Sequence, residues 1–199
     1  MLTVIGEALV DEVLSDTAPK RFHPGGSPLN VAVGVARLGR PVQFVGRYGT
    51  DAYGQLIHEH LRGNSVLTPL PPDDLPTSVA TALLDPAGGA RYTFDLTWQL
   101  PSLADALPRL LDGTTMLHTG SIASMLQPGA DAVLRAVERA RPSATITYDP
   151  NCRPSIITDA AYARDQAEKF VALADVVKAS DEDLAWLFPE EDPRDAARR

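Results

Sequence analysis

Short apolar runs alternate along the chain with longer stretches in which apolar residues recur every three or four positions. The first pattern predicts strands and the second predicts amphipathic helices. The predicted strands cover residues 2–6, 9–13, 42–47, 114–118, 144–149 and 175–178. The predicted helices cover residues 28–38, about 51–62, 128–140, 159–174 and 180–187. This alternation indicates an α/β fold with a doubly wound, mostly parallel sheet. The charged tail over 189–199 has no apolar period, and we expect an unfinished connection there.

Two further segments interrupt this rhythm. Residues 79–84 and 90–95 predict a β-hairpin joined by the turn-forming sequence Asp-Pro-Ala-Gly-Gly. Because this hairpin stands between helical segments, we expect it to form an antiparallel flap outside the main sheet.

Composition and charge narrow the functional classes. The 199 residues are 44% apolar and 22% charged, as in an ordinary globular domain, and carry a formal net charge of -8. An acidic chain without a basic run argues against binding to nucleic acid or to anionic membranes. The single cysteine, Cys152, fits a reducing compartment, and no signal peptide or long apolar run is visible. We therefore expect a cytoplasmic protein.

Polar and glycine-rich clusters lie at the ends of predicted strands. They are Asp11, residues 118–121, residues 149–153 and residues 178–180. In open parallel sheets, ligands bind at the carboxyl ends of the strands. We therefore expect these clusters, which are far apart in the sequence, to meet at one cleft.

The sharpest local signal is Pro24-Gly25-Gly26-Ser27-Pro28-Leu29-Asn30. Two glycines before a helix allow a ligand to approach the backbone closely, and we expect Ser27 to cap that helix. Free N–H groups of the first turn can donate to hydroxyls or to an anion. The amide of Asn30 both donates and accepts, which suits a sugar diol. A simple tight turn into a helix is the alternative interpretation.

The spacing of this segment resembles the N-terminal signature of the PfkB, or ribokinase-type, carbohydrate kinases. The matching positions are Gly25, Gly26, Asn30, Ala32, Gly39 and Gly49. Further matches lie in residues 6–11, 46–54, 120–122, 149–154 and 177–184, so the resemblance covers nearly the whole chain. The Gly-Glu-Ala-Leu-Val-Asp opening and the Asp-Pro-Asn-Cys-Arg-Pro segment look most like fructokinases, although keto-deoxygluconate kinases share much of this pattern.

The resemblance implies that residues 1–199 form the N-terminal part of a single ribokinase-like domain. It implies a small β lid, built from about 13–23 and 79–95, that closes over the sugar and excludes water. Phe94 is then the expected apolar contact of the lid with the substrate, whereas ordinary strand alternation is the alternative. The resemblance also allows a homodimer formed through the lid in the full-length protein.

The sugar contacts that the resemblance implies are Asp11, Gly25, Gly26 and Asn30. A carboxylate such as Asp11 can accept from two adjacent hydroxyls. Asp51 matches a recurrent Gly-x-Asp-x-x-Gly element, but capping of a helix explains it equally well.

Residues after the later strands are expected to face the phosphates. Arg153 is implied as a substrate contact because a guanidinium suits phosphate oxygens, and an ion pair with Asp149 is the alternative. Lys178, Ser180 and Asp183 are implied as cofactor contacts for ATP and Mg²⁺, with Asp183 as the candidate metal ligand. Ser180 and Asp183 stand where the family usually carries Asn-x-x-Glu, which puts the metal role in doubt, and Ser180 can instead cap a helix.

The family's catalytic aspartate lies in a Gly-Ala-Gly-Asp segment that this sequence lacks. We therefore expect an ATP-dependent sugar kinase, most like a fructokinase, whose base and ATP pocket lie beyond residue 199. The alternatives are a keto-deoxygluconate kinase, a ribokinase, or a non-catalytic sugar-binding fragment. A nucleotide-binding oxidoreductase is disfavoured, because Gly6 stands alone where Gly-x-Gly-x-x-Gly would be needed.

Overall fold

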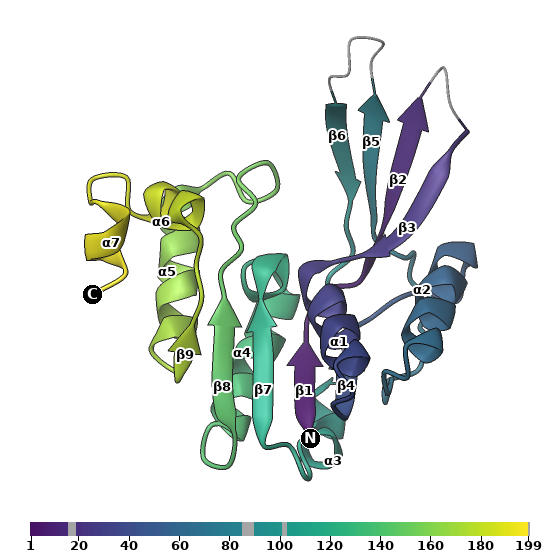
Figure 1. Ribbon diagram of the computed structural model, residues 1–199, viewed down its shortest axis with the longest axis horizontal. Coiled ribbons are helices and arrows are strands. Elements are labelled where there is room, and N and C mark those ends of the chain that lie inside the picture. The colour runs from purple at the N-terminus through teal and green to yellow at the C-terminus, as the bar shows by residue number, and fades with distance from the viewer. Residues whose placement is uncertain (16–18, 85–89, 101–102, 199) are drawn as a thin grey trace.

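A five-stranded sheet forms the centre of the molecule. The computed structural model describes residues 1–15, 19–84, 90–100 and 103–198. The strands are β1 (Leu2–Ile5), β4 (Val42–Val45), β7 (Met116–Gly120), β8 (Thr145–Asp149) and β9 (Val176–Val177). Their order is β4-β1-β7-β8-β9, and every neighbouring pair is parallel, as the sequence predicts (Figure 1).

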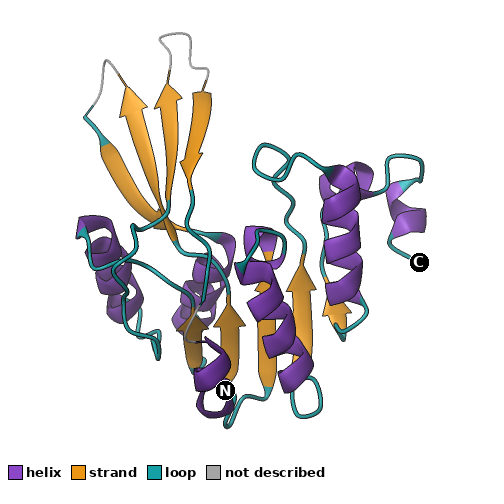
Figure 2. Ribbon diagram, turned by 180° about the vertical axis from the view of Figure 1, so that it is seen from behind, coloured by secondary structure: helices purple, strands orange, loops and turns teal. Residues whose placement is uncertain are grey.

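Helices cover both faces of this sheet. One face packs against α1 (Ser27–Arg37) and α2 (Ala52–Gly63), and the other against α3 (Leu103–Leu110), α4 (Gly129–Ala140) and α5 (Ala160–Val171) (Figure 2). Successive side chains of a strand point to opposite faces, so Val4 joins one core and Ile5 the other. The predicted doubly wound fold is confirmed.

A second, smaller sheet rises from the carboxyl end of the first (Figure 1). It contains β2 (Leu9–Ser15), β3 (Arg21–Gly25), β5 (Val79–Leu84) and β6 (Ala90–Asp95), in the order β3-β2-β5-β6. The pairs β2–β3 and β5–β6 are antiparallel, whereas β2 and β5 pair in parallel. The small sheet therefore begins at Leu9 and joins two separate excursions of the chain, and residues 9–13 belong to it and not to the main sheet.

The structure corrects several local expectations. Helix α1 begins at Ser27, and Gly26 is the N-cap, so Ser27 does not cap it. Helix α3 was not expected, and it contains Pro108, which sequence patterns treat as a helix breaker. The tail holds a short helix, α7 (Pro193–Ala196), whose first turn is capped by Asp192. The caps predicted at Asp51 for α2 and at Ser180 for α6 (Asp181–Leu187) are confirmed.

The sheet is open on the side of β9. Within the described residues β9 pairs only with β8, and Val176 and Val177 are 55% and 42% exposed. Apolar surface is therefore exposed at this edge. In the part of the chain that the structure describes, no helix is both long and apolar enough to cross a membrane.

Candidate functional site

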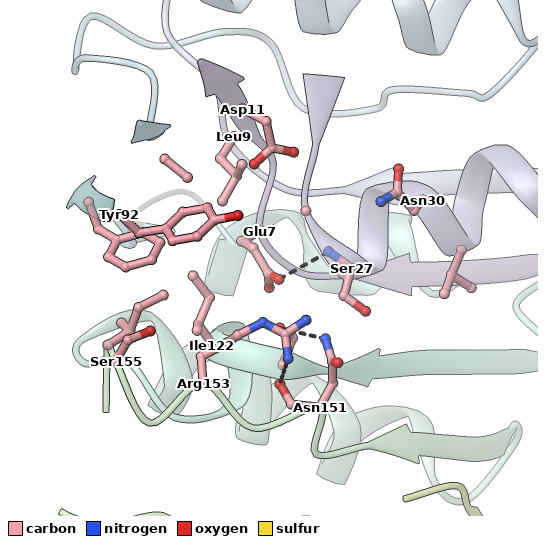
Figure 3. Close-up of a pocket in the computed structure, with 16 residues that line it drawn as sticks. Glu7, Leu9, Asp11, Ser27, Asn30, Tyr92, Ile122, Asn151, Arg153 and Ser155 are labelled. Carbon is pink, nitrogen blue, oxygen red and sulfur yellow. Dashed lines mark hydrogen bonds between the residues drawn. The ribbon is translucent and has the colours of Figure 1, made fainter. Parts of the chain in front are cut away.

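A cavity of about 740 Å³ lies between the carboxyl end of the main sheet and the small sheet. The main sheet and the loops after its strands contribute Glu7, Ser121, Ile122, Asn151, Arg153, Ser155 and Ile156. The start of α1 contributes Gly26, Ser27, Asn30 and Val31, and the small sheet contributes Leu9, Asp11, Ala80, Tyr92 and Phe94. The predicted meeting of distant strand ends is thus observed for three of the four clusters (Figure 3).

Two residues after strands β7 and β8 adopt backbone conformations that L-residues rarely use. Ser121 has φ 56° and Asn151 has φ 38°. The side-chain Nδ2 of Asn151 donates to the hydroxyl of Ser121 over 3.2 Å, which joins the two strand ends. Such strained residues concentrate at functional sites, where the surrounding structure holds them. Both line the cavity.

Asp11 lies on β2, opposite His23 of β3. Burial raises the pKa of its carboxyl group, and the nearby charge of His23 lowers it in part. A Cβ atom at position 25 would collide with the carboxylate of Asp11, so Gly25 supplies the room that this side chain occupies. Among the described residues no hydrogen-bond partner is present for the side chains of Asp11 or Asn30, and both face a cavity in which hydroxyls would satisfy them.

The N-terminus of α1 is capped by a side chain from another element. The N-cap Gly26 has φ 105°, a conformation that favours glycine, and it makes no side-chain cap. Instead, the amide of Ser27 donates to Oε1 of Glu7 over 3.3 Å. The first turn is therefore engaged by a carboxylate of the chain itself, which opposes the expectation that it binds an anion.

Glu7 follows β1 and is only 4% exposed although it lines the cavity. The amide of Ala123 donates to its Oε2 over 3.2 Å, and the hydroxyl of Ser121 donates to it as well. Burial raises the pKa of Glu7 to about 7, against the opposing effect of these hydrogen bonds. One buried carboxyl group thus joins β1, α1 and the short helix η1 (Ser121–Ser124) below the cavity.

Arg153 enters the cavity from the loop after β8. Its Nη1 donates to the carbonyl oxygens of Asn151 and Cys152, at 3.1 Å and 2.8 Å, so the loop orients the guanidinium. Asp149 pairs with Lys178 over 3.1 Å, so the alternative of an Arg153–Asp149 ion pair is not observed. Figure 3 shows Arg153 and Asp11 on opposite sides of the cavity, with Glu7 between them.

The predicted cofactor residues Lys178, Ser180 and Asp183 do not line this cavity. Asp183 is buried and accepts from the amide of Cys152 at 2.6 Å, while its other oxygen accepts from the amide and hydroxyl of Ser180. These hydrogen bonds outweigh burial and lower its pKa. The carboxylate is therefore occupied in a capping box, and the described residues contain no group of three or more His, Cys, Asp or Glu able to hold a metal. As arranged, these residues do not fit a magnesium site.

Sequence reasoning missed several lining residues. Glu7 lies between two predicted strands and was given no role, Ser27 was expected only to cap a helix, and Tyr92 was not singled out. The ring of Tyr92 stacks on that of Phe94, with centroids 6.3 Å apart, so the strand presents two aromatic rings to the cavity. The available signal for Glu7 was a charged residue at the end of the first predicted strand, where ligand-binding residues of parallel sheets lie.

The chain matches a known protein family along almost its whole length. The model of the pfkB family carbohydrate kinases matches residues 2–199. The chain belongs to the pfkB family of carbohydrate kinases.

Proteins similar to this chain include fructokinases and a sugar kinase. The chain is 34% identical to a fructokinase from Klebsiella pneumoniae, and the match covers 95% of this chain and 63% of that protein. A fructokinase structure from Vibrio cholerae O395 is 27% identical, with a TM-score of 0.83, and the match covers 99% of this chain and 69% of that one. The structure of a sugar kinase from Pyrococcus horikoshii in complex with ATP is 26% identical, with a TM-score of 0.82. The match covers 96% of this chain and 66% of that one. The chain thus spans less than two thirds of the Klebsiella enzyme's length.

The raised pKa of Glu7 predicts that the stability of this protein depends on pH. Glu7→Gln should remove this contribution to the pH dependence. The folded protein keeps the proton between the ordinary pKa of 4.5 and about 7, whereas the unfolded chain releases it. The stabilisation is complete below the lower value and is lost as the pH rises through the higher one. Relative to Glu7→Gln, the wild-type free energy of unfolding should fall by about 3 kcal/mol over this range.

Denaturant unfolding from about pH 4 to pH 8 measures this difference. The control is Glu168→Gln, which replaces an exposed carboxyl group on α5. Its free energy of unfolding should vary with pH in parallel with that of the wild type. If the free energy of unfolding of Glu7→Gln also varied with pH in parallel with that of the wild type, Glu7 would ionise in the folded protein as it does in water.

Proposed function

We propose that the protein to which this chain belongs is an ATP-dependent sugar kinase that phosphorylates a primary hydroxyl, with fructose as the favoured substrate. The observation that carries the proposal is the cavity, which brings Asp11, Asn30, Asn151 and Arg153 together from three separate parts of the sequence. These side chains supply the donors and acceptors that a polyhydroxylated ligand needs.

Sugar recognition is divided between the two sheets. Asp11 accepts from adjacent hydroxyls, and Asn30 at the start of α1 both donates and accepts. Gly25 and Gly26 leave room for this contact, because side chains there would strike Asp11 and the backbone at Glu7. Tyr92 and Phe94 cover the apolar face of the sugar as the small sheet closes as a lid, which excludes water from the reacting hydroxyl.

The charges that line the cavity favour a neutral sugar over a sugar acid. Asp11 and Glu7 are carboxyl groups, and Arg153 is the one arginine or lysine among the lining residues of this cavity. A keto-deoxygluconate carboxylate would meet repulsion from Asp11 and would depend on Arg153 alone. Phosphorylation of keto-deoxygluconate, which this charge pattern disfavours, and phosphorylation of ribose, which is neutral, are the alternatives within the class.

Phosphoryl transfer needs parts that lie outside these 199 residues. In the family, a C-terminal aspartate takes the proton of the hydroxyl, and a helix N-terminus binds the donor phosphates. In this chain Arg153 lines the cavity, which supports a role in orienting the acceptor beside the transferring group. ATP is proposed as the donor, in line with its presence in the Pyrococcus horikoshii structure. Mg²⁺ is expected to accompany ATP.

A panel of sugars assayed with ATP and the full-length protein tests the proposal. Fructose should give the highest kcat/KM, above ribose and keto-deoxygluconate. Failure to phosphorylate any ketose, pentose or sugar acid would refute the assignment.

Replacement of Asp11 by alanine should chiefly weaken sugar binding. The carboxylate positions hydroxyls and does not take the proton, and removal of one charged hydrogen-bonding partner costs about 1.5–3 kcal/mol. The dissociation constant for fructose should rise roughly ten- to hundredfold. Titration calorimetry measures it, with Asp159→Ala, on the remote helix α5, as the control. Unchanged affinity would show that Asp11 does not contact the sugar.

We also propose that residues 1–199 alone do not transfer phosphate. Asp11, Gly26 and Asn30 can orient a hydroxyl, but none of them is a base placed to activate it, and a primary alcohol is too weak an acid to react unaided. Purified residues 1–199 should therefore show no ATP turnover above a no-enzyme control. Turnover well above that control would overthrow this prediction. A cooperative melt that fructose shifts upward, without turnover, would identify a sugar-binding module.

A further inference from the structure

Residues 46–54, here called the support segment, connect β4 to α2 and do not line the cavity. Their sequence is Gly-Arg-Tyr-Gly-Thr-Asp-Ala-Tyr-Gly, with three glycines and one buried arginine. A substrate role does not explain them. Their contacts instead lead to the base of the small sheet, where the chain enters β5 and leaves β6.

The side chain of Arg47 joins both of these connections. It is 4% exposed and forms a bidentate ion pair with Asp73, at 2.6 Å and 3.0 Å. It also donates to the carbonyl oxygens of Leu75 and Pro76, just before β5, and to that of Thr97, just after β6. A guanidinium has five N–H groups in a fixed plane, and here it makes five hydrogen bonds.

Asp51 holds the same connection through Thr77. Its Oδ1 accepts from the Thr77 hydroxyl at 2.7 Å and its Oδ2 from the Thr77 amide at 2.8 Å. The Thr77 hydroxyl in turn accepts from the amide of Gly49 at 2.9 Å. The cap that Asp51 gives to α2 is thus only part of what this carboxylate does.

The rest of the small sheet is reached from the same segment. The hydroxyl of Tyr53 donates to Glu12 of β2 over 3.4 Å, and its ring lies 5.6 Å from that of Phe22 on β3. Ser78 and Thr97 bond each other across the two connections, at 3.0 Å and 3.2 Å. The support segment therefore contacts β2, β3 and both connections of the β5–β6 pair.

Close packing explains one of the glycines in this segment. A Cβ atom at position 54 would collide with the carbonyl oxygen of Gly49 and would lie 3.0 Å from the Thr77 hydroxyl. A larger residue would push the start of α2 away from the base of the small sheet.

We propose that Arg47 and Asp51 are positioning residues that set the small sheet over the cavity, so that sugar binding depends on them although they do not touch the sugar. The positioning of the small sheet follows from the contacts alone, and the effect on sugar binding rests on the proposed function. The strands that these residues hold are the ones that carry Ala80, Tyr92 and Phe94 into the cavity.

The test compares two helix-capping aspartates in the full-length protein. Asp51 accepts from the amide of Gly54 at 2.8 Å, and Asp159 accepts from that of Tyr162 at 3.0 Å, so alanine removes an equivalent cap in each case. Only Asp51 also contacts Thr77. In Asp51→Ala, amide hydrogen exchange in residues 79–84 and 91–95 should rise about tenfold or more, whereas Asp159→Ala should leave it unchanged.

The kinetic constants separate positioning from general loss of stability. Asp51→Ala should raise KM for fructose about tenfold and leave KM for ATP within about twofold, because only the sugar lies under the small sheet. Thr77→Val, which keeps the shape and removes the hydroxyl, should act in the same direction. Its control is Thr114→Val, a buried threonine that bonds Leu110 and Thr3 at the far end of the main sheet.

Unchanged exchange in the small sheet in both Asp51→Ala and Thr77→Val would overturn the proposal, as would an equal rise in the two control variants. If the exchange rises as expected but the wild type neither binds nor phosphorylates fructose, the proposed substrate fails and the positioning role stands. If fructose is a substrate and its KM is unchanged in both variants, the positioning role in sugar binding fails alone.

Discussion

The buried carboxyl group of Glu7 is the interaction on which the floor of the cavity depends. Three chain elements cross at this point: the end of β1, the start of α1 and the helix η1 that follows β7. Each of the last two has backbone N–H groups without a partner inside its own helix, and Glu7 accepts one from Ser27 and one from Ala123. Burial of a carboxyl group is costly, and the pKa near 7 reflects that cost.

Because Glu7 accepts from an N–H group of the first turn of α1, we propose that the glycine-rich segment contacts the sugar and not a phosphate. The segment leaves Asn30 and the backbone at Gly26 accessible from the cavity, and it places them across from Asn151 and Arg153. The one cationic group among the lining residues then stands at the end of the cavity away from Asp11 (Figure 3). The cavity therefore carries a carboxylate at one side and a guanidinium at the other, and we propose that the first binds hydroxyls and the second faces the phosphoryl group.

The small sheet carries the opposite wall, and its position is decided outside the cavity. Its strands come from two excursions of the chain that pair through β2 and β5. Pairing within the small sheet does not determine its angle to the main sheet. The ion pair of Arg47 with Asp73 and the hydrogen bonds of Asp51 with Thr77 supply a further constraint, since they hold the connection before β5. Arg47 also donates to Thr97 in the connection after β6. Residues that do not line the cavity thus set the position of one of its walls.

Local signals in the sequence were enough for most helices and strands and for the caps of α2 and α6. The family resemblance pointed to Asp11, Gly26, Asn30 and Arg153, which the structure brings to one cavity, and their contacts with a sugar stay a prediction. Apolar periods and capping side chains act within a few residues, so they can be recognised without the fold. The parallel pairing of Val10 with Val79, the burial of Glu7 and the second role of Asp51 involve residues far apart in the chain. The same holds for Asp183, whose carboxylate is occupied by the amide of Cys152. Only the tertiary structure decided these, because the free energy of a buried polar group depends on which distant partners surround it.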